Sequence, residues 1–129
     1  MPDTVLLVDD DAQLLHIAEM VFQLEGYNVV TAASGAKAME ALTQVRPDVI
    51  FLDIMMPDID GAEVCRRIRA DPKLRHVPIA VFTAAETRDQ ELLEAGADEF
   101  IVKPYSVEGL REVAKRLVAA GGQARDDGA

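Results

Sequence analysis

Five short apolar runs, each followed by a segment with helical periodicity, constrain the fold of this chain most strongly. We predict the runs to be strands at residues 4–8, 27–31, 49–52, 78–83 and 99–102. We expect the helices near residues 14–24, 34–45, 60–69, 86–95 and 110–118. Strands that alternate with helices favour a parallel sheet with helices on both faces. The predicted fold is therefore a single α/β domain of the doubly wound (βα)5 kind.

The third run has the composition of a strand that is buried on both faces. Residues 49–52 are all apolar, Asp53 follows them directly, and Pro57 stops the segment. A short apolar run without alternation is typical of a central parallel strand. Asp53 is then expected at the carboxyl end of a central strand, where open α/β sheets place their ligands. The alternative is that Asp53 merely ends a strand, as Asp often does at turns.

Polar residues occur at the carboxyl ends of four of the five predicted strands. They are, in chain order, Asp9, Asp10, Asp53, Thr83 and Lys103. Crossover connections place the carboxyl ends of all parallel strands at one edge of the sheet. We therefore expect these five side chains to lie close together.

Such a cluster predicts a particular chemistry. Three neighbouring carboxylates repel one another unless a pKa rises or a cation binds. Oxygen ligands without His or Cys favour a hard ion such as Mg²⁺. A Lys ammonium and a Thr hydroxyl beside such an ion can hold phosphoryl oxygens, and a carboxylate can itself attack phosphorus to give an acyl phosphate. The sequence thus indicates phosphoryl transfer, with Asp53 as the candidate nucleophile.

Composition argues against several other classes of protein. The 129 residues carry 23 acids against 13 bases, and the net charge of -10 disfavours direct nucleic-acid binding through a basic face. The chain lacks an apolar run long enough for a membrane span and does not start with a basic secretory signal. The single cysteine, Cys65, excludes an internal disulfide. We therefore expect a cytoplasmic protein without membrane contact.

Four fragments in this order resemble the receiver domain of two-component response regulators. They are Leu-Leu-Val-Asp-Asp-Asp at residues 6–11, Asp-Ile-Met-Met-Pro-Asp-Ile-Asp-Gly at 53–61, Phe-Thr-Ala at 82–84 and Gly-Ala-Asp-Glu-Phe-Ile-Val-Lys-Pro at 96–104. The resemblance covers residues 4 to about 119. It implies a flavodoxin-like five-stranded sheet with the strand order 2-1-3-4-5.

The resemblance also implies roles for the acidic residues. Asp53 is similar in position to the phosphoacceptor of the family. Asp10 resembles a direct ligand of Mg²⁺ (or Mn²⁺), and Asp9 resembles a ligand that acts through water. The metal set is completed by Asp53 and by the backbone carbonyl of Met55.

Other positions resemble the partners of the phosphoryl group. Lys103 and Thr83 correspond to the side chains that contact phosphoryl oxygens, and the amide N–H of Ala84 lies beside them in the sequence. Thr83 and Phe100 correspond to the switch pair of the family. Asp58 is interpreted as a turn residue and Asp60 as a helix cap.

The resemblance implies partners as well. A sensor histidine kinase or a phosphotransfer protein would donate the phosphoryl group from a phosphohistidine, and the domain would catalyse only its own phosphorylation and dephosphorylation. The face formed by the fourth helix, the fifth strand and the fifth helix would then bind a downstream effector protein, an output domain or a second copy of the chain. We expect the receiver domain at residues 1–120 and a flexible tail or truncated linker at 121–129.

Three alternatives are weighed against this interpretation. A phosphatase of the haloacid-dehalogenase kind also uses a strand-end Asp, but it would need a second Asp where this chain has Met55. A flavin carrier would need Ser, Thr and Gly after the first strand, where this chain has three Asp residues at 9–11. Within the resemblance, the chain could also be the receiver of a larger regulator such as a diguanylate cyclase.

Overall fold

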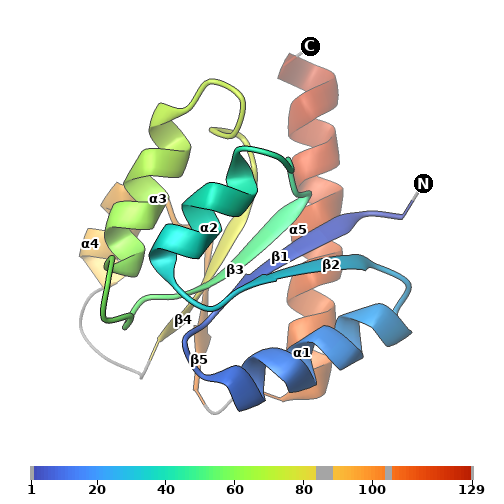
Figure 1. The fold of residues 1–129 in the computed structure, drawn as a ribbon. Coiled ribbons are helices and arrows are strands. Elements are labelled where there is room, and N and C mark those ends of the chain that lie inside the picture. Colours follow the sequence, from blue (N-terminus) through green and yellow to red (C-terminus); the bar gives the residue numbers. More distant parts are fainter. Residues whose placement is uncertain (1, 84–88, 104–105, 129) are drawn as a thin grey trace.

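A parallel sheet of five strands lies between two layers of helices (Figure 1). The computed structural model describes residues 2–83, 89–103 and 106–128, with side chains as far as residue 120. The strands are β1 (Thr4–Val8), β2 (Asn28–Ala32), β3 (Val49–Asp53), β4 (Ile79–Thr83) and β5 (Glu99–Val102). The helices are α1 (Ala12–Leu24), α2 (Gly35–Leu42), α3 (Gly61–Ala70), α4 (Asp89–Ala95) and α5 (Val107–Gly128). The strand order β2-β1-β3-β4-β5 confirms the predicted fold.

The central strand β3 is buried along its whole length, as predicted. Its alternate residues point to opposite faces of the sheet. Ile50 and Leu52 pack in the core beneath α2, α3 and α4, whereas Phe51 packs in the core beneath α1 and α5. The Phe51 ring lies 5.0 Å from that of Phe22 and 6.0 Å from that of Phe82, measured between centroids. This burial fixes the position of the residue that ends the strand, Asp53.

The described helix ends lie within three residues of the predicted ones, except at the carboxyl end of α5. The fourth helix is described from Asp89, and its predicted start at Glu86 lies outside the described residues. The backbone of α5 continues as a helix to Gly128, where the sequence predicted a flexible tail from residue 121. Gln, Ala and Arg at 123–125 are good helix formers, which the neighbouring glycines obscured. The division of the chain at residue 120 stays a prediction. Among the described helices, none combines the length and the apolar character that crossing a bilayer requires.

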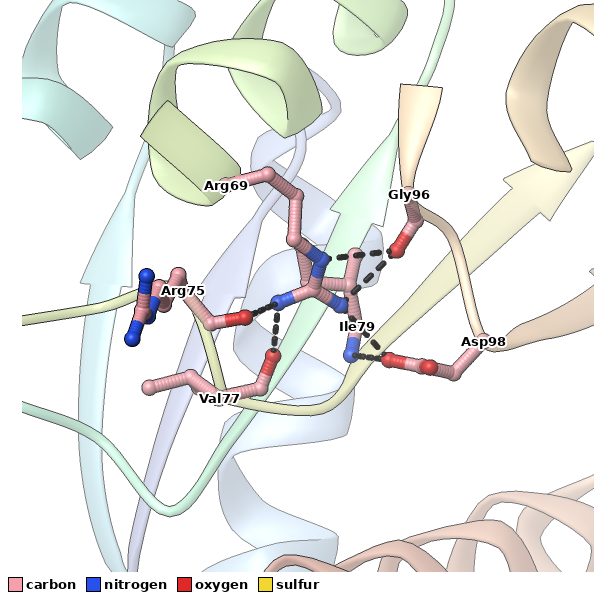
Figure 2. Close-up of polar contacts among 6 residues, drawn as sticks. All are labelled: Arg69, Arg75, Val77, Ile79, Gly96 and Asp98. Carbon is pink, nitrogen blue, oxygen red and sulfur yellow. Dashed lines mark hydrogen bonds and ion pairs between the residues drawn. The ribbon is translucent and has the colours of Figure 1, made fainter. Parts of the chain in front are cut away.

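An arginine joins three segments at the edge of the sheet where β4 and β5 begin (Figure 2). The Arg69 guanidinium, near the end of α3, donates hydrogen bonds of 2.6–3.0 Å to oxygens of Arg75, Val77, Gly96 and Asp98. The Asp98 carboxylate also accepts a 2.8 Å hydrogen bond from the Ile79 N–H. The end of α3, the start of β4 and the turn between α4 and β5 are therefore tied to one side chain.

Candidate functional site

The carboxyl ends of β1, β3, β4 and β5 meet at one edge of the sheet, as the parallel topology requires. Asp53 is the last residue of β3 and is paired in register with Phe82 of β4. Asp9 directly follows β1, and Lys103 directly follows β5. The predicted convergence of these side chains is therefore present in the fold.

Three carboxylates form an acidic cluster at this edge. Oxygens of Asp9, Asp10 and Asp53 all lie within 4.8 Å of one another. Asp9 and Asp53 are buried, with 3% and 4% of their surface exposed, whereas Asp10 is exposed. Oδ1 of Asp9 accepts a hydrogen bond from the Asp11 N–H at 2.9 Å, and Oδ1 of Asp53 accepts one from the Met55 N–H at 3.3 Å. The backbone thus fixes one oxygen of each buried carboxylate.

Lys103 places a single positive charge between the two buried acids. Its Nζ lies 3.4 Å from Oδ2 of Asp9 and 3.5 Å from Oδ2 of Asp53. The ammonium also lies 5.8 Å from the centroid of the Phe82 ring. The Lys103 N–H donates a 2.8 Å hydrogen bond to the Thr83 carbonyl. The end of β4 therefore holds the start of the lysine side chain in position.

The acidic cluster holds more negative charge than the Lys103 ammonium neutralises. The pKa of Asp53 is raised from 3.8 to about 6, chiefly by burial and next by the Asp9 charge, while Lys103 and the Met55 N–H act in the opposite direction. A divalent cation offsets this kind of repulsion, and an all-oxygen donor set suits Mg²⁺ or Mn²⁺. The carboxylates of Asp9, Asp10 and Asp53 fit such an ion, and the Met55 carbonyl follows two residues after Asp53.

The two residues predicted to form a switch lie on the same face of the sheet. Val81 of β4 pairs with Phe100 of β5, and Thr83 is two residues further along β4. Strand alternation therefore directs both Thr83 and Phe100 towards the layer of α2, α3 and α4. Thr83 is buried, and Phe100 is partly buried against that core. Ala84, the other predicted partner of a phosphoryl group, lies outside the described residues.

The loop after Asp53 packs tightly against the start of α3. A Cβ on Gly61 would lie 2.5 Å from the Cα of Ile54 and 2.8 Å from the carbonyl oxygen of Asp53, so only glycine fits there. The Gly61 N–H donates a 3.1 Å hydrogen bond to the Ile54 carbonyl. Asp60 caps α3 by accepting a 2.8 Å hydrogen bond from the Ala62 N–H, as the sequence predicted.

One contact of this loop was not predicted from the sequence. Asp58, interpreted as a turn residue, accepts hydrogen bonds from the Gly35 N–H at 3.1 Å and from the Ala36 N–H at 2.8 Å, both at the start of α2. The Ala36 N–H is the main cause that lowers the pKa of Asp58. The only local signal is that α2 has no acid in its own first turn.

The family model for the response regulator receiver domain matches residues 5–115. The chain belongs to this family. Membership confirms the resemblance and identifies a signalling domain of two-component systems, which decides against the haloacid-dehalogenase and flavin-carrier alternatives.

The chain matches part of the length of two curated relatives. It is 39% identical over 121 residues to the probable transcriptional regulatory protein TcrX of Mycobacterium tuberculosis, covering 92% of this chain and 49% of that protein. It is 41% identical over 107 residues to the DNA-binding response regulator MtrA of the same species, covering 81% of this chain and 46% of that protein. The chain thus spans about half the length of the curated relatives it matches.

Solved receiver structures share the fold almost completely. The chemotaxis response regulator CheY4 of Vibrio cholerae has a TM-score of 0.86 and 31% identity, with 91% of this chain and 99% of that chain covered. The receiver domain of the sensor histidine kinase PA1611 from Pseudomonas aeruginosa has a TM-score of 0.85 and 29% identity, with 92% of this chain and 99% of that chain covered. The latter structure is described with a magnesium ion coordinated in its active site cleft.

Proposed function

We propose that this receiver domain accepts a phosphoryl group on Asp53 from a phosphohistidine of a sensor histidine kinase or phosphotransfer protein in the cytoplasm. The observation that carries the proposal is the buried Asp53 carboxylate at the end of β3, next to Asp9 and 3.5 Å from the Lys103 ammonium. A pKa of about 6 leaves Asp53 mostly ionised at pH 7, as a nucleophile requires.

The proposed reaction is a displacement at phosphorus. A carboxylate oxygen of Asp53 forms a bond to phosphorus, and the phosphorus–nitrogen bond to the donor histidine breaks, leaving its electron pair on the imidazole ring. The product is an acyl phosphate on Asp53. Bound Mg²⁺ supplies neutralisation of the negative charge that the phosphoryl oxygens and carboxylates share. Dephosphorylation is the attack of water on phosphorus, which releases phosphate and restores the carboxylate.

Lys103 and Thr83 have the positions needed to hold the phosphoryl oxygens. Lys103 already points at Oδ2 of Asp53, so its ammonium would transfer from that oxygen to a phosphoryl oxygen. Thr83 ends the neighbouring strand β4 and is joined through its carbonyl to the Lys103 N–H. Its hydroxyl would accordingly move towards the phosphoryl group when Asp53 is modified.

The switch proposal follows from the shared face of Thr83 and Phe100. Movement of Thr83 towards Asp53 leaves space beside β4, which the Phe100 ring on β5 can enter. The described part of α4 buries one large apolar side chain, Leu92, whereas Leu93 is 51% exposed, so a small apolar contact holds this helix. Phosphorylation would then alter the face formed by α4, β5 and α5, hereafter the output face.

Three exposed apolar side chains support the proposal that the output face binds a partner. Leu93 of α4, Val102 of β5 and Val107 of α5 are 51%, 50% and 43% exposed. Because the curated relatives are about twice as long and one is named as DNA-binding, we favour an attached output domain as the partner. A separate effector protein or a second copy of the chain are the other partners that this surface would suit.

The protein donor would dock on α1, which begins beside the acidic cluster. Ile17, Met20 and Leu24 lie on one side of this helix and are 49%, 50% and 80% exposed. An Ile17→Asp variant should be labelled by acetyl phosphate at the normal rate but more slowly by a kinase. If the variant is labelled at the wild-type rate by both donors, the kinase does not dock on α1.

The phosphoacceptor is tested by intact-mass spectrometry. Incubation of the chain with Mg²⁺ and acetyl phosphate should add one phosphoryl group, and Asp53→Asn should not accept it. Equal labelling of the variant would assign the modification to another residue and overturn the proposal.

A further inference from the structure

We propose that Asp58 is a positioning residue for the phosphorylation site, acting by holding residues 54–60, the acceptor loop, against the start of α2. The proposal rests on the function proposed for Asp53, because the acceptor loop follows that residue and carries the Met55 carbonyl. Asp58 itself does not belong to the acidic cluster of Asp9, Asp10 and Asp53.

The contact between Asp58 and α2 uses both carboxylate oxygens. Oδ1 accepts from the Gly35 N–H at 3.1 Å and Oδ2 accepts from the Ala36 N–H at 2.8 Å. These N–H groups belong to the first turn of α2, where no intrahelical acceptor is available and the helix dipole favours a negative charge. Ser34 caps the same helix from its own chain segment, by accepting from the Lys37 N–H at 3.1 Å. The first turn of α2 is thus held both locally and by the acceptor loop.

The close fit of Gly35 against the loop supports the same conclusion. A Cβ on Gly35 would lie 2.7 Å from the Cβ of Ile59 and 3.2 Å from the Ile59 carbonyl oxygen. Neither atom is the far end of a flexible side chain, so a larger residue would push the loop away from the helix. Backbone hydrogen bonds and steric contact therefore hold the same two segments together.

Together with this attachment, the other contacts of the acceptor loop restrict the position of the Met55 peptide. At one end, the Met55 N–H donates to Oδ1 of Asp53 at 3.3 Å. At the other end, the Gly61 N–H donates to the Ile54 carbonyl at 3.1 Å. Between these two points, Asp58 connects the loop to a different helix, beside the contact of Ile59 with Gly35. Loss of that attachment should loosen the peptide that presents the Met55 carbonyl to a metal ion.

The test compares Mg²⁺ affinity in matched variants of the full chain by isothermal titration calorimetry. Asp58→Ala should raise the Mg²⁺ dissociation constant about tenfold, the lower end of the effect typical for groups that orient metal ligands. Ser34→Ala removes the other cap of α2 and should lower the melting temperature by about 4 °C without changing Mg²⁺ affinity. If both variants lose affinity equally, Asp58 acts only through helix stability and the positioning role is wrong.

The Asp58→Asn variant distinguishes an effect of the hydrogen bonds to α2 on Mg²⁺ affinity from an effect of the Asp58 charge. The amide keeps one acceptor oxygen for α2 but has no charge to attract a cation. We expect its Mg²⁺ dissociation constant to stay within about threefold of the wild type, since partial attachment remains. An Asn variant as weak as the Ala variant would show that the retained hydrogen bond to α2 does not support Mg²⁺ binding, and would overturn the proposal.

Gly35→Ala tests the close fit between α2 and the acceptor loop, because its expected effect is unfavourable although alanine favours helices. Alanine normally stabilises a helix relative to glycine. Here we expect weaker Mg²⁺ binding and shifted amide resonances at Met55 with Asp58 still present. This variant also keeps the proposal testable if Asp58→Ala fails to fold. Unchanged affinity in folded Gly35→Ala would contradict it.

The two proposals fail in different ways. If wild-type Asp53 is not phosphorylated, the proposed function is wrong. If Asp53 is phosphorylated normally and Asp58→Ala and Gly35→Ala bind Mg²⁺ like the wild type, only the positioning role is wrong.

Discussion

The Lys103 ammonium lies 3.5 Å from Oδ2 of Asp53, yet the pKa of Asp53 is raised to about 6. Desolvation of the buried carboxyl and the nearby Asp9 charge together outweigh the attraction of the lysine. The site therefore holds an excess of negative charge before any ligand binds. This imbalance makes the stability of the domain depend on pH and on divalent cations.

The first prediction concerns pH in the absence of Mg²⁺. Between about pH 4 and 6, native Asp53 holds a proton that the unfolded chain has lost, so its contribution to stability falls as pH rises. A shift from 3.8 to about 6 corresponds to at most about 3 kcal/mol of lost stability above pH 6. Asp53→Asn should therefore be more stable than the wild type at pH 7, and the difference should vanish towards pH 4.

Urea unfolding of both proteins at several pH values measures this difference. Carboxyls outside the acidic cluster titrate alike in both proteins, so subtraction removes their contributions. A stability difference that is independent of pH would show that Asp53 ionises normally in the folded chain.

The second prediction concerns Asp10, the proposed metal ligand. Asp10→Ala removes one charge from the acidic cluster, so thermal stability without Mg²⁺ should hold or rise. At a Mg²⁺ concentration of about 100 times the dissociation constant, the wild type should gain about 2.7 kcal/mol and the variant nothing. The control is Asp11→Ala, which removes the cap of α1 and should cost about 1 kcal/mol while keeping the gain from Mg²⁺. A marked loss of stability in metal-free Asp10→Ala would make Asp10 a structural residue.

The third prediction concerns the lifetime of the phosphorylated state. Met55 follows Asp53 by two residues, is 67% exposed, and cannot orient a water molecule for attack on phosphorus. An amide there can add one hydrogen bond to that water, so Met55→Asn should speed dephosphorylation about tenfold. Met55→Leu is the matched control and should decay like the wild type. The measurement is loss of the phosphorylated mass with time, and equal decay of all three proteins would exclude a role for this position.

The fourth prediction concerns the output face. Beryllofluoride with Mg²⁺ mimics an acyl phosphate, so it should shift the amide resonances of Thr83, Phe100 and α4 as well as those around Asp53. Phe100→Ala should keep the shifts around Asp53 and reduce those in α4, because the ring no longer fills the space that Thr83 leaves. Shifts confined to the acidic cluster in the wild type would rule out this switch.

The convergence of Asp9, Asp53 and Lys103 could be predicted because it depends only on local patterns and one topological rule. Each residue ends a recognisable apolar run, and parallel strands place their carboxyl ends together. The caps at Asp11 and Asp60 were predictable for the same reason, since each contacts N–H groups within three residues.

Contacts that join distant segments were not predictable. Asp58 reaches α2 across 23 residues, and Arg69 reaches the Gly96 carbonyl across 27 residues. Neither side chain belongs to a local motif that indicates such a partner, because the partners are backbone groups that any residue carries. The raised pKa of Asp53 likewise depends on burial, which follows from packing rather than from neighbouring residues.

The Arg69 contacts have a mechanical consequence for α4. Two nitrogens of the guanidinium hold the Gly96 carbonyl, directly after the last residue of this seven-residue helix (Figure 2). With that end held, a displaced α4 would swing rather than slide, and its travel would increase with distance from Gly96. The helix would then rotate about its Gly96 end, which lies at the end of the sheet opposite Asp53.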